Sequence, residues 1–387
     1  MRTLYTIPCV DAGVGATCRS ILRAATMAGY RPDLFSSRVQ RPGGEPYLTH
    51  QTLPGLLGRV PYRGFGPIID AVTHRRFLSA LNEGDIAYLW PSVPLPVYEK
   101  LAERNIPVVA EAVNTLMSVA KPILDAAYEG LGLAPAHAIT EARILDQERR
   151  FALCDAVFVP NRITEAAMAA TAMAARTIGA SFGTWVPARL PDRPARPPHA
   201  PVRFLFLGTV CVRKGVHLLL DAWRDAPPGV ELRIVGPMEP AIERLFGDIL
   251  NGANVSYAGY TRDVETEFHR ADVAILPSLE EGDPIATYES AAHGLPVLAS
   301  PAGAGRLGEQ AGIIDILDPA DKARMLDRIG AYAACEELRR HRGALARQAA
   351  REFDWAIVGP RRFALVDEHL ARRTVAGTTA AAPGARR

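Results

Sequence analysis

Lysine, paired cysteines and long apolar runs are all scarce in this chain of 387 residues. Only four of the 44 basic residues are lysines, so a lysine in a motif carries more information here than one of the many arginines. The five cysteines are odd in number and lack C-x-x-C spacing, which argues against a disulfide framework and favours a reducing cytosol. The sequence has no apolar run of 18 residues, so we expect no membrane-spanning helix, and the short apolar N-terminus indicates a first strand rather than a signal peptide.

The overall composition predicts an ordinary globular protein with more than one domain. Hydrophobic residues make up 48% of the chain and charged residues 22%, and the formal net charge is +2. That small charge does not point to a nucleic-acid partner. A chain of this length exceeds the usual size of one hydrophobic core, so we expect two domains.

Apolar strand-like runs alternate with helical patterns along both halves of the chain, which predicts parallel α/β sheets. Six prolines between Pro187 and Pro201 indicate an interdomain linker. The predicted units are an N-terminal domain at 1–190, a C-terminal domain at 201–355, a helix at 356–372 and a disordered tail at 373–387. The main predicted strands are Thr3–Val10, Asp85–Leu89, Pro107–Ala110, Ala156–Pro160, Arg203–Leu207, Glu231–Val235, Val255–Tyr257, Val273–Leu276 and Pro296–Ser300.

The most informative segment is P-S-L-E-E-G-D-P-I-A-T-Y-E-S-A-A-H-G-L-P, from Pro277 to Pro296. It follows a predicted strand, with Asp283 suited to cap the next helix, Pro284 to begin it and Gly294 to end it. A strand–loop–helix unit places its loop at the carboxyl edge of a parallel sheet, where α/β proteins bind ligands. Glu281 and Glu289, separated by seven residues, could therefore hold the two ends of one polar ligand.

This segment resembles the E-x(7)-E signature of retaining glycosyltransferase family four. The resemblance implies a GT-B fold, in which two Rossmann-like domains face a cleft, and a nucleoside-diphosphate sugar donor. It also implies that Glu281 contacts the donor sugar and that Glu289 holds the nucleotide ribose. Gly282, Asp283, Pro284 and Ile285 occupy the positions of the family's G-F-G-L loop. Asp283 and Pro284 depart from that loop, and because proline has no N–H, one donor to the sugar or phosphates is missing.

A second motif, F-L-F-L-G-T-V-C-V-R-K-G-V-H, runs from Phe204 to His217. A strand ends near Gly208, and the cations Arg213 and Lys214 precede a helix, an arrangement that favours a bound anion. The resemblance assigns Lys214 to the family lysine that binds the donor diphosphate. Thr209 replaces the family arginine, and Arg213 is the candidate substitute. A solvated basic turn is the competing interpretation.

Further candidate residues carry weaker signals. Tyr260, Thr261 and Arg262 could line the base pocket or merely form a turn. On the acceptor side the candidates are Gly13 and Gly15, in the first strand-to-helix turn, and Glu111 and Asn114, which stand where relatives carry a sugar-binding histidine. Tight turns and a capped loop explain these four residues about as well.

The resulting hypothesis is a retaining, metal-independent, hexosyltransferase-like enzyme in which Lys214, Arg213 and Glu281 serve the reacting end of the donor. Preorganised cations stabilise the charge that develops on the leaving diphosphate, and no D-x-D motif indicates a metal. No cofactor beyond the sugar nucleotide is expected. The location is expected to be cytoplasmic, with peripheral membrane contact left open if the acceptor is a lipid. The alternatives are a sugar-nucleotide epimerase or hydrolase on the same fold and a catalytically idle sugar-nucleotide-binding subunit.

Overall fold

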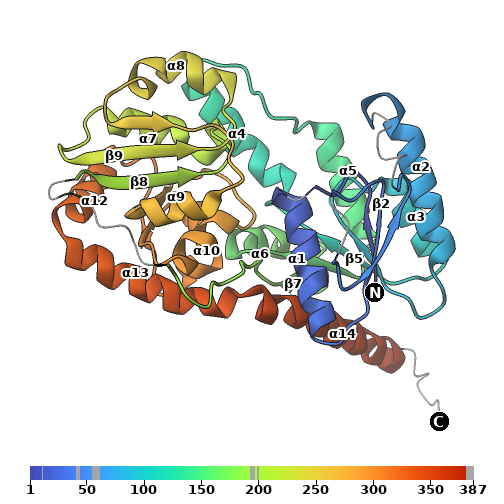
Figure 1. Cartoon of the computed structure of the whole chain (residues 1–387). Helices are drawn as coiled ribbons and strands as arrows, with labels where there is room; N and C mark the ends of the chain where they lie inside the picture. The colour runs from blue at the N-terminus through green and yellow to red at the C-terminus, as the bar shows by residue number, and fades with distance from the viewer. Residues whose placement is uncertain (11, 41–43, 55–61, 192–196, 198–199, 381–387) are drawn as a thin grey trace, which may run out of the picture.

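The computed structural model describes residues 1–10, 12–40, 44–54, 62–191, 197 and 200–380, which form two α/β domains, each built on a parallel sheet (Figure 1). In the N-terminal domain the described strands follow the order β3-β2-β1-β4-β5-β6-β7. Its elements are β1 (Arg2–Tyr5), α1 (Gly13–Met27), β2 (Asp33–Ser36), β3 (Leu48–Gln51), α2 (Tyr62–Ala80), β4 (Ala87–Leu89), α3 (Leu95–Glu103), β5 (Val108–Glu111), α4 (Met117–Gly130), α5 (Glu141–Ala152), β6 (Ala156–Val159), α6 (Arg162–Ala169), η2 (Ala174–Arg176) and β7 (Thr177–Gly179).

The C-terminal domain has the described strand order β10-β9-β8-β11-β12-β13. Its elements are β8 (Val202–Leu207), η3 (Val212–Lys214), α7 (Val216–Trp223), β9 (Val230–Val235), α8 (Pro240–Leu250), β10 (Val255–Tyr257), α9 (Val264–Arg270), β11 (Val273–Leu276), α10 (Ile285–Ala292), β12 (Val297–Ala299), α11 (Pro301–Ala304), η4 (Gly305–Glu309), β13 (Asp315–Ile316), α12 (Lys322–Ala334), α13 (Glu336–Ala350), η5 (Arg351–Phe353) and α14 (Trp355–Ala380).

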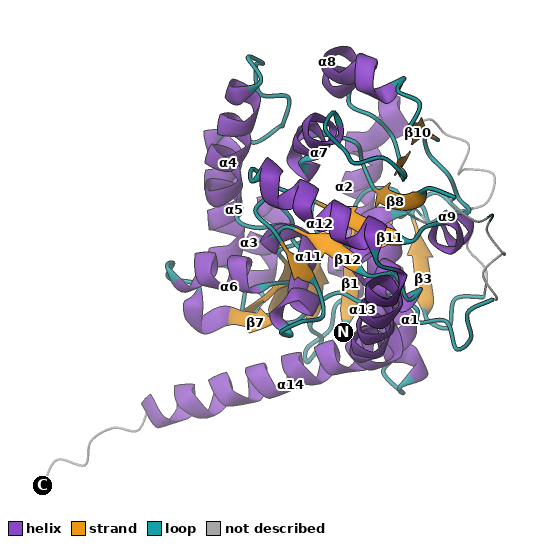
Figure 2. Ribbon diagram, turned by 90° about the vertical axis from the view of Figure 1, so that its left-hand side faces the viewer, coloured by secondary structure: helices purple, strands orange, loops and turns teal. Residues whose placement is uncertain are grey.

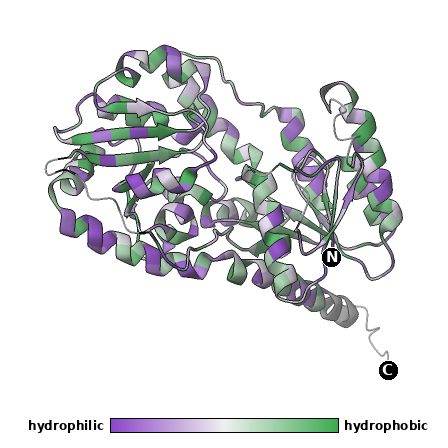
Figure 3. Ribbon diagram, viewed as in Figure 1, coloured by the Kyte–Doolittle hydropathy of each residue, from purple (hydrophilic) through white to green (hydrophobic). Residues whose placement is uncertain are grey.

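Burial on both faces explains the continuous apolar strands at the centre of each sheet. All four residues of β11 (V-A-I-L) are buried, as are all four of β6 (A-V-F-V). Parallel strands covered by helices on both faces show this pattern. Figure 3 shows that the helices around the sheets carry both hydrophilic and hydrophobic residues. The expected fold class, two parallel-sheet α/β domains, is confirmed.

Helix α14 begins beside the C-terminal domain and packs along α1 of the N-terminal domain (Figures 1 and 2). Its side chains Trp355, Val358, Phe363 and Val366 join the apolar core of that domain. The helix continues to Ala380, beyond the predicted end at residue 372, so residues 373–380 are helical where a disordered tail was predicted. The predicted tail at 381–387 lies outside the described residues, as do residues 192–196 and 198–199 of the proline-rich linker.

Helix α4 lies in the segment between Leu116 and Thr140, which connects β5 to α5. It extends from the N-terminal domain and places Tyr128 in the main apolar core of the C-terminal domain. The Tyr128 hydroxyl donates a 2.7 Å hydrogen bond to Glu239, and the Glu239 carboxylate also accepts from the Val212 N–H at 3.1 Å. The helix therefore joins the N-terminal domain to the loop that carries Arg213 and Lys214.

Two local predictions were wrong. The first strand ends at Tyr5 rather than Val10, because Pro8 has no N–H to donate and only an isolated bridge at Cys9 resumes the pairing. Small residues at 166–175 predict one surface-packed helix, but α6 ends at Ala169 and a 3₁₀ turn follows at 174–176.

Candidate functional site

The two cations of the predicted anion-binding loop meet the first glutamate of the second motif. Lys214 and Arg213 end η3, after the carboxyl end of β8, and Glu281 follows the neighbouring strand β11. The Lys214 ammonium contacts one carboxylate oxygen of Glu281, and Arg213 Nη1 lies 3.2 Å from the other. Ser278 Oγ donates a further 3.1 Å hydrogen bond to this carboxylate. The fold therefore brings three predicted site residues together at the carboxyl edge of the sheet.

The Glu281 carboxylate is buried, whereas the side chains of Arg213 and Lys214 are partly exposed. Burial by itself raises the pKa of Glu281, but Lys214 and Arg213 outweigh it and hold the pKa below its ordinary value. The adjacent Glu280 is also buried and lies 3.4 Å from Arg213 Nη1, and burial raises its pKa. Glu281 is therefore the carboxylate that stays ionised between the two cations. An incoming polyanion would compete with it for the same cations.

The G-D-P loop after Glu281 is packed against the N-terminal domain. A Cβ atom at Gly282 would lie 1.7 Å from the Val113 carbonyl oxygen, so only glycine fits this close approach. The Asp283 carboxylate accepts from the Phe182 N–H at 2.6 Å and from the Tyr288 hydroxyl at 2.5 Å. The prediction that Asp283 caps α10 was wrong, because Pro284 occupies the N-cap position and the Asp283 side chain binds across the domain junction instead.

Other N-terminal-domain residues complete this junction. The side-chain amide of Asn161 donates hydrogen bonds from Nδ2 to the backbone carbonyl oxygens of Glu281 and Gly282. The Thr115 N–H donates to Glu280 at 3.2 Å, and the exposed Asn114 lies against Gly282. Arg306 contributes from the other domain by donating to the Pro160 carbonyl at 2.7 Å. The loop expected to face a donor sugar is thus held at the contact between the domains.

The second glutamate of the motif, Glu289, lies on helix α10. It lines a cavity of about 370 Å³ between the two domains. Burial raises the pKa of Glu289 to about 7, and no residue in the described part of the chain forms an ion pair with its carboxylate. The cavity lining is Ala16, Thr17, Arg19, Ser20, Arg23, Glu45, Thr184, Trp185, Val264, Glu265, Phe268, Ile285, Glu289, His293 and Trp355. A roomy cavity with convergent polar groups and a perturbed carboxyl is a candidate ligand site.

The raised pKa of Glu289 predicts a pH dependence of stability. A carboxyl whose folded pKa of about 7 exceeds its ordinary 4.5 favours folding when protonated, so its contribution is lost as pH rises from about 4.5 through 7. The Glu289→Gln variant cannot ionise, so its unfolding midpoint should match the wild type near pH 5 and exceed it by about 2 °C or more near pH 8.

Differential scanning fluorimetry across this pH range tests the expectation. Glu265→Gln is the matched control, since Glu265 is exposed beside the same cavity. A difference between Glu289→Gln and wild type that stays constant with pH would contradict the assignment.

The other residues that the sequence predicted for the site lie in three parts of the fold. Gly208 follows the last residue of β8, and Thr209 is exposed beside it. Tyr260 and Arg262 are exposed in the β10–α9 connection. Gly13 and Gly15 begin α1, and a Cβ at Gly15 would lie 2.4 Å from the Val10 carbonyl oxygen, so tight packing accounts for that glycine.

Glu111, an acceptor-side candidate, belongs to a buried ion pair in the structure. Its carboxylate is buried between the guanidinium of Arg362 on α14 and the Tyr88 hydroxyl, and it contacts both. Arg362 also donates to the Ala180 and Ser181 carbonyls at 2.7 and 2.8 Å, and its guanidinium lies 4.1 Å from the Phe158 ring centroid. Glu111 therefore anchors the C-terminal helix within the N-terminal domain.

Sequence reasoning missed several residues of the junction, among them Asn161, Ser278, Glu280 and Arg306. Asn161 also caps α6, where its side chain accepts from the Thr164 N–H at 2.8 Å. A capping residue at that position was recognisable, but its contact with Gly282, 121 positions away, was not.

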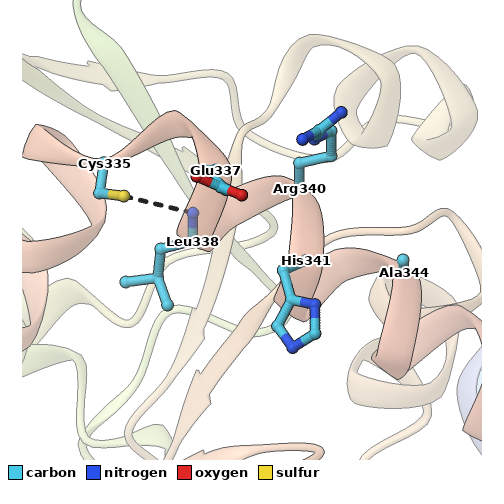
Figure 4. A pocket seen from close by; sticks show the side chains of 6 residues that line it. All are labelled: Cys335, Glu337, Leu338, Arg340, His341 and Ala344. Atoms are coloured by element: carbon cyan, nitrogen blue, oxygen red, sulfur yellow. Dashed lines mark hydrogen bonds between the residues drawn. The ribbon is translucent and has the colours of Figure 1, made fainter.

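A second pocket, of about 580 Å³, lies at the turn between α12 and α13 and holds none of the predicted site residues (Figure 4). Its lining includes Cys335, whose sulfur accepts from the Leu338 N–H at 3.4 Å. Over the described residues, no group of three or more His, Cys, Asp or Glu side chains is placed to hold a metal ion. The described helices include none that is long and apolar enough to span a bilayer.

Parts of the chain are similar to known glycosyltransferases. Residues 201–333 match the family model of glycosyl transferases group 1. A protein of Escherichia coli (strain K12) described as a colanic acid biosynthesis glycosyltransferase, WcaL, is 28% identical over 125 residues, 29% of this chain and 31% of that protein. MMP alpha-(1->4)-mannosyltransferase of Mycolicibacterium hassiacum is 31% identical over 170 residues, 41% of each chain. The matched segments thus span less than half of these relatives.

The solved structures resemble the whole chain. Sucrose-phosphate synthase from Thermosynechococcus elongatus superposes with a TM-score of 0.71 at 19% identity, covering 96% of this chain and 100% of that one. Anabaena HepE in complex with UDP and glucose gives 0.66 at 14% identity, covering 95% and 98%. These likenesses show that the fold is that of GT-B glycosyltransferases.

Proposed function

We propose that this protein is a retaining, metal-independent glycosyltransferase that moves a sugar from a nucleoside-diphosphate sugar to an acceptor hydroxyl. The observation that carries the proposal is the convergence of Lys214 and Arg213 on buried Glu281 at the carboxyl edge of the sheet. Glu289 lines a cavity from the helix that follows the same loop. HepE, which shares the fold, was solved with UDP and glucose, in line with this class of donor.

The chemistry follows from charge. Breaking the sugar–phosphate bond leaves negative charge on the diphosphate and positive charge on the anomeric carbon. Lys214, Arg213 and the N-terminus of α7 would stabilise the leaving group without a metal, because fixed cations and amides need no reorganisation as charge develops. The Glu281 carboxylate would then turn from its cations to the donor sugar hydroxyls. Retention of configuration rests on the resemblance of the E-x(7)-E segment.

Thermal unfolding in the presence of UDP-, GDP- and ADP-sugars and NAD tests the donor class. A ligand at about 100 times its Kd adds roughly 2.7 kcal/mol to the stability of the state that binds it, which shifts the unfolding midpoint measurably. We expect one sugar nucleotide to stabilise the protein selectively. Stabilisation by NAD alone, or by none of these ligands, would contradict the proposal.

A catalytically idle sugar-nucleotide-binding subunit is the second candidate. The packing of Gly282 and Asp283 against the N-terminal domain favours it, because this loop would have to release Val113 and Phe182 before its amides could face a sugar. An idle subunit would be stabilised by a donor yet release no nucleoside diphosphate with any acceptor. An epimerase would leave the donor's sugar–phosphate bond intact at equilibrium.

We propose a cytoplasmic location for the enzyme, as its cysteine usage favours.

A further inference from the structure

Among the residues that the structure describes, an exposed apolar face lies on α2, on the side of the N-terminal domain away from the C-terminal domain (Figure 1). Phe65, Ile68 and Val72 are spaced three and four residues apart, so they share one face of the helix. Their exposed fractions are 51%, 67% and 42%. Pro67 and Ala71 are exposed between them. We call these five residues the α2 apolar face.

Exposed apolar residues elsewhere on the described surface do not form such a row. Leu145, Leu245 and Ile316, for example, lie on α5, α8 and β13, one to an element. Single exposed apolar side chains are common and need no explanation, whereas a contiguous exposed row marks an interaction surface. The α2 apolar face is therefore the part of the surface that calls for a partner.

The charges along α2 identify the kind of partner. Arg75 and Arg76 are exposed one turn beyond Val72. Asp70 is the single acidic residue in the α2 sequence, and it is half-buried and accepts 2.8 and 2.7 Å hydrogen bonds from the Tyr62 hydroxyl. The described exposed side chains of α2 are thus apolar, small or basic. An apolar face followed by arginines matches the interface of a bilayer that carries anionic lipids.

The position of α2 in the fold suits this partner. The strands β3, β2, β1 and β4 are parallel, so α2, which links β3 to β4, runs back across the sheet and begins at its carboxyl edge. Phe65 and Ile68 lie in the first two turns. The N-terminus of α1 lies at this same edge. A bilayer on the α2 apolar face would therefore lie beside the ligand-binding edge of the N-terminal domain.

We infer that the α2 apolar face docks the protein on anionic lipid bilayers, with Phe65, Ile68 and Val72 in the interface and Arg75 among the headgroups. This docking goes beyond the proposed transfer reaction and does not require it. The partner is a lipid surface rather than a second copy of this chain, because the paired arginines would repel their equivalents in an isologous contact.

Flotation of the full-length protein with liposomes tests the inference. Vesicles of phosphatidylcholine with about one third phosphatidylglycerol should carry the wild type upward, and added salt should weaken binding. The Phe65→Ser/Ile68→Ser variant should lose about tenfold or more in partitioning. The Arg75→Glu variant should lose about tenfold on these vesicles and little on pure phosphatidylcholine.

Ile316→Ser, at an exposed residue of the other domain, is the matched control and should float like wild type. Unfolding midpoints establish that each variant is folded, and gel filtration reports self-association. Three results would overturn the inference: no flotation of the wild type, equal flotation of the Phe65→Ser/Ile68→Ser variant, or a wild-type dimer that this variant dissolves while lipid binding is absent.

Discussion

Replacing Lys214 by alanine is expected to lower sugar transfer by about 10²-fold or more. The ammonium is one of two cations at the carboxyl edge beside Glu281, and the proposed reaction needs it when charge develops on the leaving diphosphate. Loss of one preorganised donor of this kind typically costs about 10² to 10³ in kcat. Release of nucleoside diphosphate from the donor that stabilises the protein is the measurement.

Lys100→Ala makes the same chemical change on the exposed surface of α3 and should leave turnover unchanged. Donor binding by the Lys214→Ala variant should be followed alongside, by calorimetry. Full turnover by this variant would remove Lys214 from the leaving-group role. Weakened binding with unchanged kcat would limit it to holding the donor.

Replacing Arg362 by alanine is expected to lower the free energy of unfolding by about 3–5 kcal/mol. This is the usual cost of removing one partner from a buried ion pair, since Glu111 would then stay buried without its counter-charge. Arg362 and Glu111 are 1% and 4% exposed. The change also removes hydrogen bonds to the Ala180 and Ser181 carbonyls, next to Phe182, whose N–H binds Asp283. Chemical denaturation measures the change.

The Arg372→Ala variant is a suitable control, because its side chain is exposed on the same helix. It should unfold within about 0.5 kcal/mol of wild type, as exposed charge substitutions usually do. If Arg362→Ala were equally mild, α14 would not depend on this ion pair for its place on the N-terminal domain.

The C-terminal domain could be predicted closely because its elements carry strong local signals. Strands β10 and β11 have the bounds that their apolar runs predicted. Glu281, Lys214 and Arg213 could be grouped because parallel strands bring their following loops to one edge of the sheet.

The interdomain contacts could not be predicted, because they join residues far apart in the sequence. Glu111 and Arg362 are separated by 251 positions, and neither has a local signal for the other. Asp283 and Tyr128 likewise bind partners in the opposite domain. The α2 apolar face was missed for a related reason, since apolar residues on a helix predict burial until the fold shows which face is covered.

The most direct test of the central claim is a ³¹P and ¹H NMR time course of the protein with the sugar nucleotide that stabilises it and candidate acceptors. We predict that nucleoside-diphosphate signals grow while the sugar appears in a product with the donor's anomeric configuration, and that Lys214→Ala slows both. A donor that binds but keeps its sugar–phosphate bond with every acceptor, or a product of inverted configuration, would contradict the assignment of a retaining glycosyltransferase.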